Sequence, residues 1–323
     1  MNIINPYDLL EVLQEMIGRG PGWLLRRLKI SKTERVSAAW GDKAEMRIWP
    51  GKLVRHTNKK ISGDENESPV VYFTKKYLSG RDSVTALSVG CGEGTHELEW
   101  AKTGMIARLD AFDLSDQRIQ MAKRRAAEAK LDDILKFEVR DIFNTKVEDN
   151  KYDLALAIAS LHHFSPLEQS ISKIAEVLKP GGLFYVNEFV GPRKWQWTDT
   201  QLAGASKMIK MIPRTYRKRK NGFYLNRAWR PGLLRMYFSD PSEAVESDRI
   251  IPLLDKYFER VEFKPLGGAI TQLVFGKIAH NFLNDDAETR TLIEMVLAEE
   301  ESLLEEKLIE SDFLYAVYRK PQI

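Results

Sequence analysis

Short apolar runs alternate with amphipathic segments along residues 84–190 of the chain. The amphipathic segments place apolar residues three and four positions apart, which predicts helices near 95–103, 116–130 and 167–178. Strand–helix alternation at this spacing predicts an α/β fold with a parallel, doubly wound sheet. The apolar runs predict strands at Thr85–Val89, Ala107–Phe112, Leu135–Val139, Asp153–Ala159 and Leu183–Phe189.

The pattern differs before this stretch. Asn5-Pro6, followed by apolar residues at helical spacing, predicts a helix near the N-terminus. Residues 23–29 combine apolar and basic side chains, which would suit a membrane surface or a helix docked on the core. Residues 50–68 are polar and predict an irregular connection, and a helix around 69–79 leads into the main domain. We therefore expect an N-terminal helical extension over residues 1–80.

The alternation also stops after the predicted core of residues 81–190. Residues 191–250 are rich in Trp, Arg, Lys and Tyr without a strand pattern, which predicts an inserted lid or substrate subdomain. Residues 251–323 are expected to complete the same domain. Their predicted elements are a strand near 260–265, a helix near 270–283, an acidic helix over 287–310 and a strand over 313–319.

Charge is unevenly distributed along the 323 residues, although the net charge is only +3. Residues 191–240 contain twelve Lys or Arg against two acidic residues, and residues 285–312 contain eleven Asp or Glu against two basic residues. The two blocks face each other, or the basic block attracts an anionic partner. The strongest basic run, Arg214–Lys220, suits nucleic-acid phosphates, an acidic sugar or phosphate, or plain solvent.

Cysteine content and hydropathy exclude several classes of protein. Cys91 is the single cysteine, which excludes an internal disulfide and a cysteine-rich metal site. The N-terminus lacks the charged start and apolar run of a signal peptide. No stretch approaches the roughly eighteen apolar residues of a membrane span. We therefore expect a cytoplasmic enzyme.

The first predicted strand runs directly into three closely spaced glycines, Gly90, Gly92 and Gly94, and then into a helix. Glycine permits positive φ angles and lets a ligand approach the backbone without a Cβ in between. Because position 95 is Thr, the spacing does not meet the G-x-G-x-x-G form of a dinucleotide turn. The loop is therefore expected to bind a cofactor other than NAD.

Acidic residues follow at the ends of the next two strands. Asp113 stands where a carboxylate can accept both hydroxyls of a ribose, although it could instead cap a helix, a role that Ser115 suits better. Asp141 could accept the amine of an adenine while Ile142 and Phe143 cover the ring, or it could be a solvated loop residue. Since three strand ends meet in register, the combination favours a nucleoside site.

With these motifs, the chain resembles the class I S-adenosylmethionine-dependent methyltransferases over roughly residues 70–190. Residues 152–157 resemble the fourth strand of the family, and residues 177–183 resemble the turn before the fifth. The resemblance implies a Rossmann-like methyltransferase sheet and S-adenosylmethionine as the cofactor. Ser88 departs from the family, in which many members carry an acid near the methionine amino group. The residues implied to bind the cofactor are Gly90, Cys91, Gly92, Gly94, Asp113, Leu114, Asp141, Ile142 and Ala159.

Beyond residue 190 the resemblance continues in three segments, 188–192, 196–199 and 239–245. They are similar to a bacterial branch of the family that is associated with sugar and polysaccharide pathways, which implies O-methylation of a sugar-containing metabolite or glycan. Alternatives are methylation of RNA or another small metabolite, and a protein that binds cofactor or glycan without turnover. Base methylation is disfavoured, because the fourth strand ends in Ala159-Ser160-Leu161-His162 and not in an Asn-Pro-Pro-Tyr type of motif.

The candidate catalytic residues follow the fourth and fifth strands, where the acceptor pocket of the family lies. His162 and His163 end the fourth strand segment, and histidine titrates near neutral pH as a general base should. One of these rings could instead pack under the cofactor. Glu188 at the end of the fifth strand is a second candidate base, or a structural carboxylate. We predict His163, His162 and Glu188 as the catalytic set, and no metal.

Overall fold

The computed structural model describes residues 3, 5, 8, 48–81, 83–141 and 148–322. The chain divides into two compact units. The first, here called the sheet unit, contains residues 58–190, 245–264 and 314–323. The second, here called the helical unit, contains residues 1–57, 191–244 and 265–313. The helix predicted after Asn5-Pro6, the segment 23–29, Ile142 and Phe143 lie outside the described residues.

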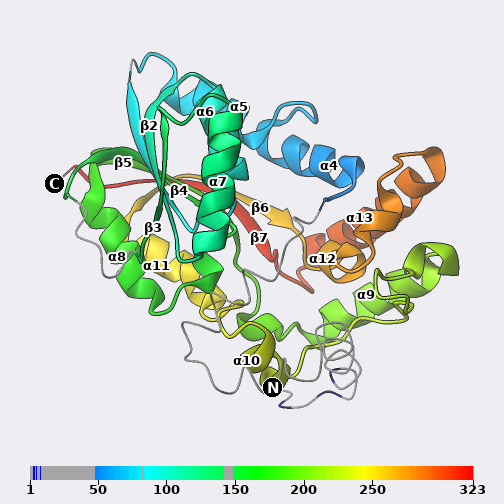
Figure 1. Cartoon of the computed structure of the whole chain (residues 1–323). Helices are drawn as coiled ribbons and strands as arrows, with labels where there is room; N and C mark the ends of the chain where they lie inside the picture. Colours follow the sequence, from blue (N-terminus) through cyan, green and yellow to red (C-terminus); the bar gives the residue numbers. More distant parts are fainter. Residues whose placement is uncertain are drawn as a thin grey trace. The chain divides into compact units, whose positions relative to one another are not determined.

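The sheet unit is built on seven strands in the order β3-β2-β1-β4-β5-β7-β6 (Figure 1). All pairs among the first five strands are parallel. The strands are β1 Val84–Val89, β2 Ile106–Asp113, β3 Leu135–Val139, β4 Tyr152–Ile158, β5 Leu178–Phe189, β6 Glu259–Gly267 and β7 Phe313–Arg319. The predicted α/β class is thereby confirmed.

The last strand of the chain runs against the others. The Lys320 N–H, directly after β7, donates to the Gly182 carbonyl near the start of β5 at 2.9 Å, and the Gly181 N–H donates back to the Lys320 carbonyl at 3.0 Å. The end of β7 therefore lies beside the start of β5, which makes this pair antiparallel and the sheet mixed. The sequence pattern predicted strands near 260–265 and 313–319, but nothing in it gave their direction.

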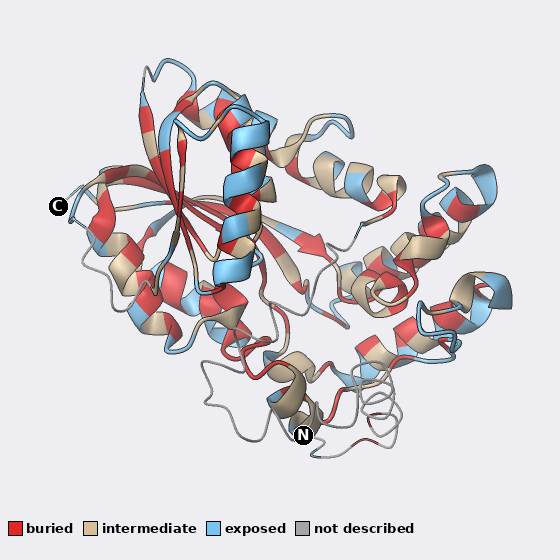
Figure 2. Cartoon of the chain, in the orientation of Figure 1, coloured by how far each residue is buried: buried red, intermediate tan, exposed pale blue. Residues whose placement is uncertain are grey.

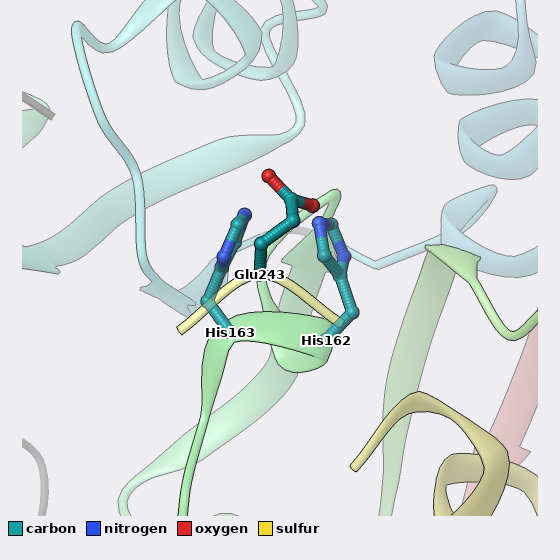
Figure 3. A group of neighbouring side chains, drawn as sticks. All are labelled: His162, His163 and Glu243. Carbon is teal, nitrogen blue, oxygen red and sulfur yellow. The ribbon is translucent and has the colours of Figure 1, made fainter. Parts of the chain in front are cut away.

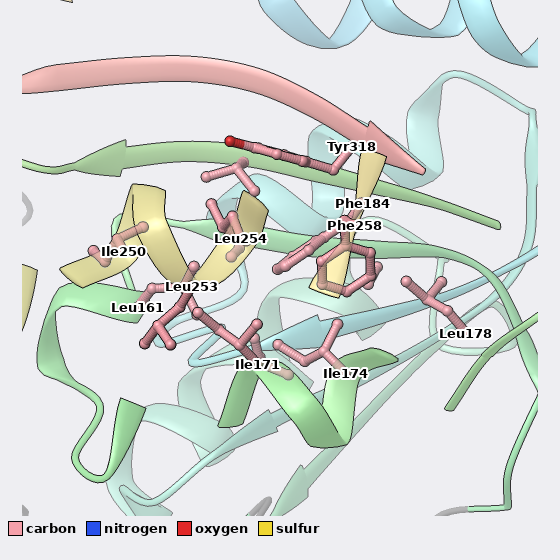
Figure 4. Close-up of a cluster of buried hydrophobic side chains, with 14 of the residues drawn as sticks. Leu161, Ile171, Ile174, Leu178, Phe184, Ile250, Leu253, Leu254, Phe258 and Tyr318 are labelled. Atoms are coloured by element: carbon pink, nitrogen blue, oxygen red, sulfur yellow. The ribbon is translucent and has the colours of Figure 1, made fainter. Parts of the chain in front are cut away.

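Helices cover both faces of the sheet, as the strand–helix alternation predicted. Neighbouring strand residues point to opposite faces. On β5, Phe184 packs in a buried cluster with α8 (Leu167–Val177) and α11 (Ile250–Tyr257), as Figure 4 shows. Its neighbour Tyr185 meets Phe73 of α5 (Pro69–Phe73) and Trp100 of α6 (Thr95–Lys102) on the other face, with ring centroids 5.4 and 5.0 Å apart.

Helix α7 (Asp116–Glu128) illustrates why these segments fold as helices. Ser115 caps its first turn, because its hydroxyl accepts a hydrogen bond from the Arg118 N–H at 3.4 Å. Ile119, Ala122 and Ala126 recur at helical spacing and are fully buried, while the opposite side is exposed, as the colour bands along α7 show (Figure 2).

The helical unit has a core of its own. It contains α9 (Asp199–Met211), α10 (Leu233–Ser239), α12 (Thr271–Phe275) and α13 (Ala287–Glu305). Its buried residues come from the predicted insertion and from residues 265–313 alike, so these two segments share one core. Members of that core include Ile209, Leu225, Phe275, Ile278, Phe282, Ile293 and Val296.

Two predictions of local structure were wrong. The polar segment 50–68 was expected to be irregular, but it contains α4 (Gly51–Ser62), because Leu53 and Ile61 form a narrow buried stripe under long polar side chains. The helix expected near 270–283 is interrupted. It consists of α12, which ends at Phe275 with Gly276 as its C-cap, and a separate 3-10 turn over Ala279–Phe282.

Candidate active site

The candidate site lies where the strand order of the sheet reverses. From β1 the chain proceeds outward to β2 and β3, and then returns to β4 on the other side of β1. In open α/β sheets ligands bind at such a switch point, beyond the carboxyl ends of the strands. The predicted cofactor loop follows β1 at this edge.

The glycine loop has the geometry that its sequence predicted. Gly90, Gly92 and Gly94 all have positive φ angles, of 71, 54 and 75°. A Cβ on Gly90 would lie 2.7 Å from the Ser160 Cβ, and a Cβ on Gly94 would lie 2.7 Å from the ring of Phe137. The loop therefore passes so close to β3 and to the segment after β4 that side chains at these two positions are excluded.

Asp113 holds the glycine loop in place. Its carboxylate accepts hydrogen bonds from the Gly92 N–H at 2.9 Å and from the Ser115 N–H at 2.8 Å. The carboxylate thus joins the end of β2 to the loop after β1 and to the start of α7. Leu114, the next residue, is 44% exposed despite its apolar side chain. Both residues stand at the edge where the sequence predicted ribose and base contacts.

The third strand end is described only as far as Asp141. Its neighbour Arg140 donates its N–H to the Asp113 carbonyl at 3.0 Å, which continues the β2–β3 pairing to this edge. Asp141 is half-buried beside it. Ile142, predicted to cover the adenine ring, lies outside the described residues. The proposed adenine contact of Asp141 stays a prediction.

A strained residue directly follows β4. Ala159 is exposed and has a φ of 49°, a left-handed conformation that costs an L-residue with a Cβ about 1–2 kcal/mol. Directly after it, Ser160 is buried, and among the described residues its hydroxyl has no hydrogen-bond partner. Backbone strain and an unsatisfied buried hydroxyl next to the glycine loop indicate that this edge of the sheet is part of a functional site.

A buried carboxylate next to the loop was missed by the sequence analysis. Glu97 in the first turn of α6 is 2% exposed, and its Oε1 accepts a hydrogen bond from the Ser88 hydroxyl at 2.6 Å. Its Oε2 has no partner among the described residues. Burial raises the pKa of Glu97 to about 7, and the charge of Asp113 acts in the same direction. The one signal in the sequence for this pair is that Glu97 follows Ser88 by nine residues, in the first turn of the helix after the glycine loop.

The three predicted catalytic residues lie together at the ends of β4 and β5. Glu188 is 1% exposed and accepts hydrogen bonds from the N–H groups of Ser160 and, at 2.7 Å, Leu161. Its other oxygen lies 2.8 Å from Nδ1 of His162. The rings of His162 and His163 lie side by side with centroids 4.0 Å apart (Figure 3). His162 is buried, and His163 is the more exposed of the two.

These contacts separate the roles that the three side chains can take. Glu188 holds the loop after β4 with one oxygen and the ring of His162 with the other, which makes it an orienting residue. A carboxylate on Nδ1 fixes the tautomer and the orientation of an imidazole.

Cys91 lies inside the loop and is buried. It is 8% exposed, and burial together with the negative charges of Glu97 and Asp113 raises the pKa of its thiol well above the ordinary value. A raised pKa favours the neutral thiol, which is the less reactive form. The predicted contact of Cys91 with the cofactor stays a prediction.

Comparison with known proteins supports a methyltransferase domain. Residues 81–231 match a family model described as a methyltransferase domain. The chain is 31% identical over 104 residues to a 27-O-demethylrifamycin SV methyltransferase of Amycolatopsis mediterranei, covering 32% of this chain and 38% of that protein. It is 34% identical over 147 residues to a sterol 24-C-methyltransferase of Pneumocystis carinii, covering 44% of this chain and 38% of that protein.

Solved structures are similar over most of the chain. Phosphoethanolamine N-methyltransferase 2 of Haemonchus contortus, in complex with S-adenosyl-L-methionine, superposes with a TM-score of 0.53 at 15% identity. The superposition covers 91% of this chain and 60% of that one, which shows the fold. The sequence matches span only 38% of each of the two curated relatives. In the described part of the chain, none of the helices has the length and apolar character needed to cross a bilayer.

Proposed function

The chain carries a class I S-adenosylmethionine-dependent methyltransferase domain with S-adenosylmethionine as its cofactor, and we propose that it transfers the methyl group to a hydroxyl of a small molecule. The observation that carries this proposal is the glycine loop locked by Asp113, with the Glu188–His162 pair at the neighbouring strand ends. Methyl transfer from a sulfonium needs an acceptor held in line and, for a hydroxyl, a base.

We propose that residues at the ends of the strands hold the cofactor in three places. Asp113 would accept the ribose hydroxyls with the lone pairs that its two backbone contacts leave. Leu114 and Asp141 would contact the adenine. Gly90 and Ala159 would border the cofactor at the switch point. The cofactor supplies an activated methyl group, and these side chains bind and orient it.

We further propose that the Glu97 carboxylate binds the amino group of the methionine part of the cofactor. Ser88 cannot supply the acid that many members of the family carry at that position, but its hydroxyl holds the Glu97 carboxylate there. A buried carboxylate with one oxygen that has no partner among the described residues is suited to an ammonium group, because a buried charge needs a counter-charge.

For the chemical step we propose His162 as the base, oriented by Glu188. The imidazole would take the hydroxyl proton at Nε2 while Glu188 stabilises the resulting imidazolium through Nδ1. His163 is the alternative, since it is the more exposed ring and stands in contact with His162. The expectation of a metal-free site stays a prediction.

The acceptor is proposed to be a sugar-containing metabolite or glycan. The similarity to an O-methyltransferase of a small molecule supports a hydroxyl acceptor. The similarity to a sterol 24-C-methyltransferase makes C-methylation of a lipid the second candidate, and it would use the same cofactor and base. Methylation of RNA, and cofactor binding without turnover, are the remaining alternatives.

Calorimetry tests the cofactor half of the proposal, and labelling tests the acceptor half. S-Adenosylhomocysteine should bind with a clear heat, whereas NAD should not. Incubation with isotopically labelled S-adenosylmethionine and extracts of glycans, lipids or RNA, followed by mass spectrometry, should label a small hydroxylated compound. Binding of NAD without binding of S-adenosylhomocysteine would overturn the proposal. Label in RNA would favour RNA methylation instead, and label on a lipid carbon would favour C-methylation of a lipid.

A further inference from the structure

The helical unit carries a strongly basic segment that the proposed methyl transfer does not use. Residues 200–239 contain ten Lys or Arg and no Asp or Glu. Some of these cations form ion pairs within the unit, as Lys207 does with Glu299 and Arg230 with Asp199, both at 2.7 Å. Residues 211–224 contain five of these basic residues next to exposed apolar side chains.

The centre of this surface is a hairpin over Arg217–Leu225, here called the basic hairpin. The Arg219 N–H donates to the Phe223 carbonyl at 2.7 Å, and the Leu225 N–H donates to the Arg217 carbonyl at 2.8 Å. Gly222 turns the chain at the tip with a φ of 85°. The hairpin is thus a defined local structure with backbone pairing on both sides of its tip.

The base of the basic hairpin is fixed to the helical core. Leu225 is 2% exposed and belongs to the buried cluster of the unit. The side-chain amide of Asn281 donates to the carbonyls of Tyr216, at 2.8 Å, and Lys218, at 2.7 Å. These contacts fix both arms of the basic hairpin to the helical core, and the tip extends from this fixed base.

Apolar side chains at the tip point into solvent. Phe223 is 51% exposed and Tyr224 is 37% exposed, and Met211 at the end of α9 is 54% exposed. Lys218 and Lys220 on the same hairpin are also exposed. Aromatic residues flanked by basic side chains are typical of protein segments that enter the headgroup region of a membrane.

The ring faces argue against stacking on bases or sugars. The guanidinium of Arg214 lies over the ring of Tyr224 at 4.4 Å, and the ammonium of Lys277 lies over the ring of Trp229 at 4.0 Å. A ring face that is covered by the protein's own cation is not available to a base. Two further aromatic side chains, Trp197 and Tyr216, are structural: Trp197 is 6% exposed and donates to Asp312 at 2.9 Å, and Tyr216 packs on Phe282.

We propose that the basic hairpin binds an anionic lipid surface, with Phe223 and Tyr224 inserted among the headgroups and Lys218 and Lys220 near the phosphates. The inference is independent of the proposed methyl transfer. The alternative partner of a basic aromatic segment is a single-stranded nucleic acid, and charge alone does not separate the two. The rings do, because single-stranded nucleic acid stacks successive bases on several ring faces, and those of Tyr224 and Trp229 are covered by cations. Phe223 is left as an exposed apolar ring beside lysines, which suits the headgroup region.

Vesicle sedimentation with the full chain tests the proposal. The protein should pellet with vesicles containing about a third phosphatidylserine and not with pure phosphatidylcholine. Lys218→Glu with Lys220→Glu should weaken binding by more than about 25-fold, since each basic residue near an anionic surface contributes about fivefold. Phe223→Ser should weaken it at unchanged charge. Lys123→Glu with Arg124→Glu, an exposed pair on α7, is the matched charge control and should bind nearly as the wild type does.

A second measurement reports insertion directly. Tryptophan placed by Phe223→Trp should be quenched by brominated acyl chains in anionic vesicles. Equal losses of vesicle binding in the hairpin and control variants would overturn the proposal. So would a wild-type protein that does not bind vesicles but binds a single-stranded RNA oligomer, if both hairpin variants abolish that RNA binding. Circular dichroism of each variant confirms that a loss of binding is not a loss of fold.

Discussion

Replacing Glu97 by glutamine should change how the stability of the protein depends on pH. The carboxylate is 2% exposed, and burial is the main cause that raises its pKa from 4.5 to about 7. Glutamine has nearly the same volume and can still accept the Ser88 hydroxyl hydrogen bond, but it cannot ionise. The variant therefore isolates the free energy of ionising this one group.

The sign of the effect follows from the raised pKa. In the folded state Glu97 keeps its proton up to about pH 7, whereas in the unfolded chain it loses the proton near 4.5. The stabilising contribution of the protonated form is complete below pH 4.5 and is lost as the pH rises through 7. At about 1.4 kcal/mol per pKa unit, the whole loss amounts to about 3 kcal/mol.

Denaturant unfolding of the cofactor-free protein at pH 5, 6, 7 and 8 measures this difference. Wild type and Glu97→Gln should have similar free energies of unfolding at pH 5, and the variant should be the more stable by up to about 3 kcal/mol at pH 8. Glu99→Gln, an exposed acid two residues away on the same helix, is the control and should run parallel to the wild type. Parallel curves for Glu97→Gln would refute the assigned cause, because a solvated carboxylate would give them.

Four further outcomes follow from the site. S-Adenosylhomocysteine should bind more tightly as the pH rises from 6 to 8 in the wild type and not in Glu97→Gln, since an ammonium group favours the ionised acid; calorimetry at each pH measures this. Asp113→Ala should weaken the same binding by roughly 1.5–3 kcal/mol through lost charge-assisted hydrogen bonds, whereas NAD stays unbound. Gly94→Ala should destabilise the fold by about 2–4 kcal/mol in thermal unfolding, because a positive φ and a clash with β3 coincide. His162→Ala should lower turnover by about 10²–10⁴-fold with unchanged cofactor affinity, and full activity of this variant together with loss in His163→Ala would move the base to the neighbouring ring.

The parts of the fold that local patterns control could be predicted from the sequence. The glycine spacing and Asp113 belong to segments where strand, turn and helix follow within a few residues, and the structure has the strands and helices there within one or two positions of the predicted ends. The direction of β7 could not be predicted in this way. Its partner β5 lies more than a hundred residues earlier in the chain, and no local pattern records which end of one strand meets which end of the other.

Composition alone could not separate structural from surface aromatic residues in the segment 191–250. Trp197 and Tyr216 are held by polar partners inside the helical unit. A Trp or Tyr has a large apolar body and one polar tip, so it serves a small core as well as it serves a binding surface. Only the exposed fraction of each ring, which depends on distant residues such as Asp312, separates the two uses.

The pair of Ser88 and Glu97 shows how a motif can be altered while its chemistry is retained. A carboxylate on β1 and a carboxylate in the first turn of α6 can reach the same place, because the glycine loop returns the chain to the end of the strand within five residues. Ser88 is too short to reach a ligand but is well placed to fix the longer Glu97 side chain at 2.6 Å. The acid is buried there, which explains its raised pKa. If this exchange is the physical basis of the departure at position 88, Ser88→Asp combined with Glu97→Gln should restore the affinity for S-adenosylhomocysteine that Glu97→Gln alone loses. Failure of the double variant, with affinity lost as in the single one, would mean that Glu97 acts through the fold of α6 and not as a counter-charge.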